Sequence, residues 1–106
     1  MAETPSHHKA KTRAAGKGGK TEVALPGGKR LDAKSAGGGR ATEVERSGSP
    51  KALEAAADRL KRSRANQKVL QVPNPDMDAA AEAMRDKGVS GTVKNMGGTK
   101  SRSVRS

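Results

Sequence analysis

The stretch RATEVERSGSPKALEAAADRLKRSRANQKVLQV, residues 40–72, decides the fold because it predicts a strand, a helix and a second strand in succession. Ser49 followed by Pro50 is a typical helix start, since serine caps the first turn and proline has a preset helical φ angle. The helix then carries apolar residues at the spacing i, i+3, i+4 and i+7: Leu53, Ala56, Ala57 and Leu60. The apolar run KVLQV, residues 68–72, has strand length and ends at Pro73. This unit predicts two parallel neighbouring strands joined by a right-handed crossover.

The residues that follow predict a second unit of the same kind. Asn74 and Pro75 repeat the cap-plus-proline signal, and Gly88 closes the segment. Apolar residues again share one helical face: Met77, Ala80, Ala81 and Met84. VSGTVKNM, residues 89–96, then predicts a final short strand. The methionines are therefore interpreted as core residues and not as a metal site.

The residues before position 40 predict an antiparallel meander. TEVAL (21–25) and KRLDAK (29–34) are separated by Pro26, Gly27 and Gly28, which suit a hairpin turn. RATEVER, residues 40–46, follows a glycine run as the third strand. The fold class is therefore α/β: a small mixed sheet in which a three-stranded meander precedes helix, strand, helix and strand.

The 106 residues have room for one small domain whose core is thin, because Phe, Tyr and Trp are absent. We expect residues 1–20 to be a basic N-terminal arm with a possible short helix that has Pro5 at its first position and Gly16 just past its end. Residues 21–96 would form a single α/β domain, and residues 97–106 a basic, flexible tail. The sparse core is compatible with a homodimer.

Charge indicates the partner. Lys and Arg number 22 against 11 Asp and Glu, a formal net charge of +11, which predicts binding to the phosphate backbone of nucleic acid. An anionic membrane surface is the rival, but no apolar run reaches the length of a membrane span and no secretory signal is visible, so we expect an intracellular, cytoplasmic protein. Without aromatic rings for base stacking, duplex or structured nucleic acid is favoured over splayed bases.

Three acids on the predicted meander are the candidate catalytic residues. Strand alternation places Glu43 and Glu45 on one face, and Asp32 on the preceding strand could lie beside them. Clustered carboxylates form a hard-oxygen pocket suited to Mg²⁺ or Mn²⁺, which can hold a phosphate and activate water. The alternative interpretation is that these are exposed structural acids of a solvent-facing strand.

An Asp after a hairpin turn, a following strand with Glu-x-Glu, then a helix and another strand resembles the PD-(D/E)XK, or restriction-endonuclease-like, nuclease superfamily over roughly residues 21–72. The resemblance implies that Asp32 and Glu43 ligate the divalent ion. Glu45 stands where the family usually has a lysine that positions or activates the attacking water, and Leu31 stands where it has proline. Arg46 or Arg40 would have to supply the missing cation.

Two functions follow. The first is a small metal-dependent nuclease, and the second is a basic protein that binds DNA or RNA without chemistry; a protein-interaction piece of a larger assembly is a weaker third. The candidate nucleic-acid contacts are Lys9, Lys11, Arg13, Lys29, Arg30, Lys34, Arg40 and Arg62. The adjacent His7 and His8 would diverge on a helix, so they do not predict a shared metal site.

Overall fold

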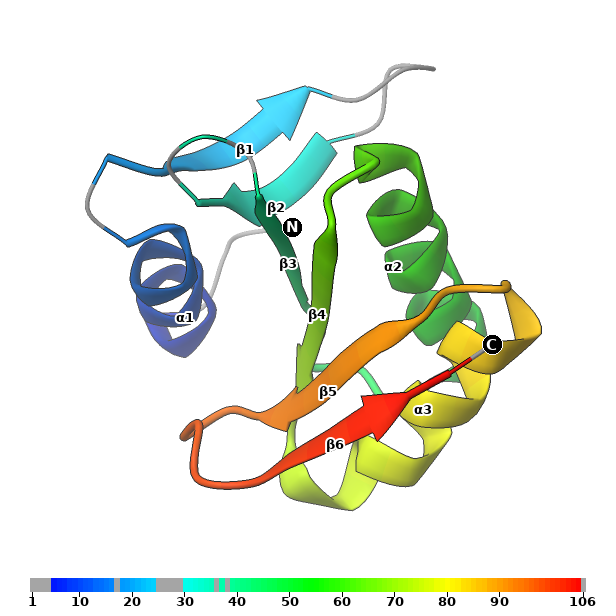
Figure 1. The fold of residues 1–106 in the computed structure, drawn as a ribbon. Coiled ribbons are helices and arrows are strands. Elements are labelled where there is room, and N and C mark those ends of the chain that lie inside the picture. The colour runs from blue at the N-terminus through cyan, green and yellow to red at the C-terminus, as the bar shows by residue number, and fades with distance from the viewer. Residues whose placement is uncertain (1–4, 17, 25–29, 36, 38, 106) are drawn as a thin grey trace.

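The computed structural model describes residues 5–16, 18–24, 30–35, 37 and 39–105 of the chain. Within these residues a six-stranded mixed sheet is covered by three α-helices (Figure 1). The predicted α/β class is therefore confirmed.

The elements are distributed along the whole chain. The helices are α1 (Pro5–Ala15), α2 (Pro50–Ser63), the short 3₁₀ helix η2 (Asn74–Asp76) and α3 (Met77–Asp86). The strands are β1 (Lys20–Ala24), β2 (Arg30–Lys34), β3 (Arg40–Val44), β4 (Gln67–Val72), β5 (Gly91–Asn95) and β6 (Ser101–Val104). The turn predicted at Pro26–Gly28 and the Thr4 that precedes α1 lie outside the described residues.

The order of strands in the sheet is their order in the chain. β1, β2 and β3 pair antiparallel as the predicted meander. β3, β4 and β5 pair parallel, and α2 and α3 form the two crossovers between them. Both predicted strand–helix–strand units are confirmed.

The helix α2 begins and ends for identifiable chemical reasons. The hydroxyl of Ser49 accepts the backbone N–H of Ala52 at 3.2 Å, and Pro50 occupies the first turn. At the other end Arg64 adopts the left-handed conformation, with φ of 57°. The predicted apolar face is fully buried, since Leu53, Ala56, Ala57 and Leu60 are inaccessible to solvent.

The helices cover the two faces of the sheet unequally (Figure 1). α2 and α3 pack on one face, which we call the helical face, over strands β2 to β6. α1 packs on the other face, over β1, β2 and β3. That second face is called the open face, because no described helix covers it over β4, β5 and β6.

The hydrophobic core cluster consists of Leu, Val, Met and Ala side chains. Because these are smaller than aromatic rings, the backbones of the packed elements must lie close together to leave no empty space between them. Leu70, Val72 and Val93 of the parallel strands and Met84 of α3 are all completely buried. A β-carbon at Gly91 would lie 2.2 Å from the backbone oxygen of Lys68, so this position in β5 requires glycine.

The predicted flexible tail over residues 97–106 is wrong in its central part. Residues Ser101–Val104 form β6, which pairs antiparallel with β5 and buries Val104. Asn95 organises the turn: its Oδ1 accepts the N–H groups of Thr99 and Lys100 at 2.8 and 3.1 Å. The sequence of β6, SRSV, has little apolar character. Its pairing therefore depends on the side chain of Asn95 and on the edge that β5 offers.

Two smaller expectations also change. Asn74 does not cap a helix with its side chain; its Oδ1 accepts an N–H of Asn95 at 2.9 Å instead. The N-terminal segment is an integral layer of the domain, because Ala10 and Ala15 of α1 are buried against the sheet. Gly16 ends α1 with φ of +65°, as the sequence predicted.

The strand β6 yields a test of stability. Val104→Ala is expected to lower the free energy of unfolding by about 2 kcal/mol, because two buried methyl groups are lost and a small cavity remains. Ser103→Ala, at an exposed neighbouring position, should change it by less than about 0.5 kcal/mol. Urea unfolding measures both, and an unchanged midpoint for Val104→Ala would show that β6 adds nothing to the core.

Candidate functional site

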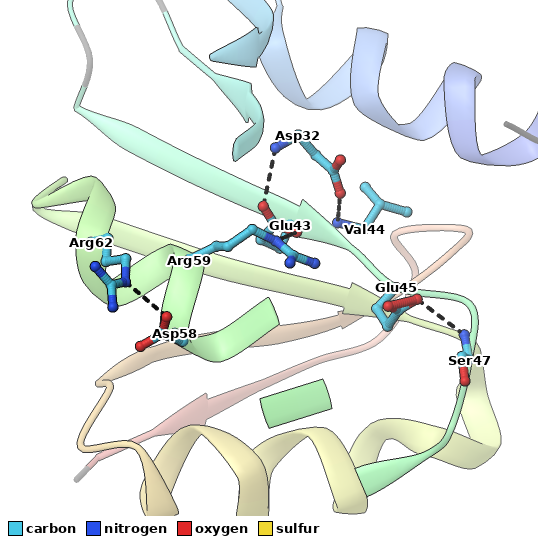
Figure 2. A network of polar contacts seen from close by, with 8 residues as sticks. All are labelled: Asp32, Glu43, Val44, Glu45, Ser47, Asp58, Arg59 and Arg62. Atoms are coloured by element: carbon cyan, nitrogen blue, oxygen red, sulfur yellow. Dashed lines mark hydrogen bonds and ion pairs between the residues drawn. The ribbon is translucent and has the colours of Figure 1, made fainter. Parts of the chain in front are cut away.

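The acids Asp32 and Glu43 lie across from each other where the backbone pairing of β2 and β3 gives way (Figure 2). The register pairs Ala33 with Thr42, and beyond that point carboxylate oxygens act as the acceptors. The Asp32 N–H donates to Glu43 Oε1 at 3.1 Å, and the Val44 N–H donates to Asp32 Oδ2 at 2.8 Å. Each strand therefore supplies a carboxylate that accepts a backbone N–H of the other, which orients both side chains.

Glu43 is the more deeply buried member of the pair. Its residue is 1 % exposed, and its Oε2 accepts the guanidinium Nε of Arg59 on α2 at 3.2 Å. Burial raises the pKa of Glu43 well above its usual value, and the neighbouring Asp32 carboxylate raises it further. Arg59 and the Asp32 N–H act in the opposite direction. The net result is a carboxyl group that releases its proton reluctantly, as is common at functional sites.

Asp32 is only partly buried, so it is the more accessible side of the pair. Together the two residues present hard carboxylate oxygens from adjacent strands, the donor type that Mg²⁺ and Mn²⁺ prefer. The predicted proximity of Asp32 and Glu43 is thus present in the fold.

Glu45 does not join this pair. It follows the end of β3, its N–H continues the ladder to the Gln71 carbonyl at 2.9 Å, and its Oε2 accepts the Ser47 N–H at 3.3 Å. Figure 2 shows its carboxylate turned toward Ser47 and away from Asp32. The described parts of the chain contain no group of three or more His, Cys, Asp or Glu residues placed to hold a metal. The expected three-acid cluster is therefore reduced to two acids.

Arg59 of α2 is a cation that contacts the pair, and it is not among the site residues predicted from the sequence. Arg40, one of the expected substitutes for the family's lysine, is exposed and bonds Gln67 through its Nε at 3.1 Å. Arg46 is exposed in the loop after β3. Helical spacing could have indicated Arg59, because it lies three residues after the buried Ala56 and four before the buried Ser63.

The predicted nucleic-acid contacts are scattered over the fold. Lys11 is only 3 % exposed, which rules it out as a surface contact; it lies on the buried side of α1, four residues before the buried Ala15. Arg13 and Arg40 are exposed, and Lys34 is half-buried. Arg62 is exposed on α2 and pairs with Asp58 at 2.8 Å. Lys29, and the side chains of Lys9 and Arg30, lie outside the described residues.

Comparison of the chain with protein-family models, with curated proteins and with solved structures gave no match. Within its described residues, the chain has no helix both long and apolar enough to cross a membrane. The function must therefore be argued from the geometry of the site and from the distribution of charge.

The buried carboxyl group predicts a pH dependence of stability. Glu43 binds its proton more tightly in the folded chain than in the unfolded chain, so folding takes up protons as this group titrates. Stability should therefore fall as the pH rises from the unfolded pKa of Glu43 through its raised folded pKa. In Glu43→Gln this part of the pH dependence should disappear.

Urea unfolding in EDTA across this pH range measures the effect, with Glu82→Gln at an exposed position of α3 as the matched control. The free energy of unfolding of Glu43→Gln should rise relative to that of the wild type as the pH increases, while the free energy of unfolding of Glu82→Gln should change with pH as the wild type's does. Parallel curves for the wild type and Glu43→Gln would contradict a raised pKa.

Proposed function

We propose that the protein binds nucleic acid and is a small divalent-metal-dependent nuclease, with Asp32 and Glu43 as ligands of Mg²⁺ or Mn²⁺. The observation that carries the proposal is the cross-strand pair of carboxylates held by backbone N–H groups. The order helix, three strands, helix, strand over α1 to β4 agrees with the arrangement that the nuclease resemblance implies. A net charge of +11 supports a polyanionic substrate.

The chemistry of the two residues fits such an ion. Mg²⁺ is commonly bound through one or two carboxylates together with water and substrate phosphates, so two acids are sufficient. Proximity of two carboxylates disfavours ionisation of both, and a divalent cation between them would relieve that repulsion. When bound, the ion would polarise a phosphate oxygen and lower the pKa of a water molecule.

The neighbouring groups prepare the ligands. The N–H groups of Asp32 and Val44 fix the two carboxylates in orientation before substrate arrives. Arg59 holds Glu43 Oε2 and favours its ionised form, which is the form that ligates a metal. Because Glu45 faces Ser47, the water-positioning role implied by the resemblance is not assigned to it.

The second candidate function is nucleic-acid binding without chemistry, and the hydrogen bonding of the acids favours it. Both carboxylates already accept backbone N–H groups, and Glu43 is paired with Arg59. No buried side-chain nitrogen or oxygen in the described residues lacks a hydrogen-bond partner. Under this alternative the acids join β2 to β3, and exposed cations contact phosphates. Both candidates act in the cytoplasm on duplex or structured nucleic acid.

The nuclease is tested by nicking of a supercoiled plasmid in Mg²⁺ or Mn²⁺. Wild-type protein should cut, and EDTA should stop it. Asp32→Asn and Glu43→Gln should each slow cutting by roughly a hundredfold or more, the scale on which loss of metal-site groups acts. Glu82→Gln is the matched control and should cut at the wild-type rate. Equal cutting by all four proteins would exclude this site, and binding without cutting would leave the second candidate.

Both candidates predict that affinity for duplex falls steeply with salt. The slope of log K against log salt should be about −0.9 for each phosphate that is neutralised. Fluorescence anisotropy with a labelled duplex between low and physiological salt measures it. A flat titration would remove nucleic acid as the partner.

A further inference from the structure

The open face carries three hollows that share lining residues and lie between α1 and the β5–β6 hairpin, and we call them together the groove. Arg40 lines all three, and Lys94 and Val69 line two of them. The first lies beside α1, where Arg13 contributes, and beneath Gly97 and Gly98. The second continues over β4 and β5 toward Ser101 of β6. The groove exists because α1 covers this face only over β1, β2 and β3.

The groove is cationic, and the described residues that line it include no acid. Arg13 and Arg40 are exposed and Lys94 is partly exposed, so their charged groups are available to a ligand. The rest of the polar lining is uncharged apart from Lys68, whose ammonium bonds the Ala65 carbonyl at 2.6 Å. These uncharged polar residues are Ser35, Thr42, Asn66, Gln67, Gln71, Thr92 and Ser101.

The balance of charge differs between the two sides of the sheet. On the helices that cover the helical face, five acids accompany five cations, so these helices carry no net charge; the acids are Glu54, Asp58, Asp78, Glu82 and Asp86. The alternation of β6 follows the same division: Arg102 pairs with Asp78 of α3, whereas the adjacent Ser101 lines the groove. Among the described residues, no acid in the walls of the groove neutralises its positive charge.

We infer that this groove binds the phosphate backbone of nucleic acid, through Arg13, Arg40 and Lys94. The inference deepens the proposed function and rests on nucleic acid being the substrate. A row of cations flanked by hydroxyl and amide groups matches phosphate and sugar oxygens. With no aromatic ring in the chain the groove has no base-stacking platform, so contact is through the backbone and is independent of sequence.

The groove and the acid pair are separate features of one strand. Arg40 opens β3, and Glu43 lies three residues further on, about 10 Å along the strand, with its side chain directed to Arg59 on the helical face. Variants of one feature can therefore be made without altering the other. Loss of nucleic-acid binding in groove variants and loss of cleavage in acid-pair variants can therefore be measured separately.

The test compares two triple variants that remove equal charge. Arg13→Gln, Arg40→Gln and Lys94→Gln remove the three groove cations to which phosphate binding is assigned, and Lys51→Gln, Lys61→Gln and Arg85→Gln remove three exposed cations from α2 and α3. Binding of a labelled duplex is measured against salt by anisotropy, with urea unfolding confirming that both variants are folded. The groove variant should bind at least about tenfold more weakly than the control, and its slope should be smaller by between 2 and 3.

Each outcome has a defined meaning. Equal losses in the two triple variants, or no loss in the groove variant, would overturn the inference, because charge alone would then account for binding. A selective loss in the groove variant supports it, whether or not the wild type cuts DNA. If Asp32→Asn and Glu43→Gln bind normally but nothing is cut, the nuclease proposal fails and the groove stands. Absence of binding by the wild type at low salt would overturn both.

Discussion

The packing of α2 on the parallel strands β3 and β4 is the contact on which the rest of the structure depends. Without aromatic side chains, the apolar area removed from water comes from Leu, Val, Met and Ala, so the helix must approach the sheet closely. Ala56 and Ala57 allow that approach, while Leu53 and Leu60 fill the space beside them. The same packing places Arg59 against Glu43, and so the core contact also sets the electrostatics of the candidate site.

The hydrogen bonds of the acid pair stabilise the fold and also orient the carboxylates that we propose as metal ligands. Two neighbouring carboxylates on a sheet repel each other, and burial of one increases the free energy of its charged form. Backbone N–H groups and Arg59 offset that cost by satisfying the oxygens. The bonds that make the pair tolerable in the folded state also hold it in a fixed geometry, which is what a metal site requires.

The unequal covering of the sheet gives the protein two different sides. The helical face contains the core, and the acids of α2 and α3 lie on the helices above it. On the open face, cations and neutral polar groups line the groove in the area that α1 does not cover. A net positive charge is a property of the whole chain, but the cationic groove forms only because the fold brings Arg13, Arg40 and Lys94 together on the open face.

The sequence by itself determined the α2 and α3 crossovers, the meander and the caps at Ser49 and Gly16, because these follow from local periodicity, capping and turn chemistry. Tertiary structure alone decided the features that depend on distant residues. The strand β6 forms because β5 offers an edge and Asn95 bonds the turn, while the carboxylate of Glu45 turns away from the acid pair and accepts the backbone N–H of Ser47. Burial of Lys11 and the approach of Arg59 to Glu43 likewise depend on how the helices pack on the sheet, because helical spacing can indicate the side of a helix on which a residue lies but not the distant residue that it contacts.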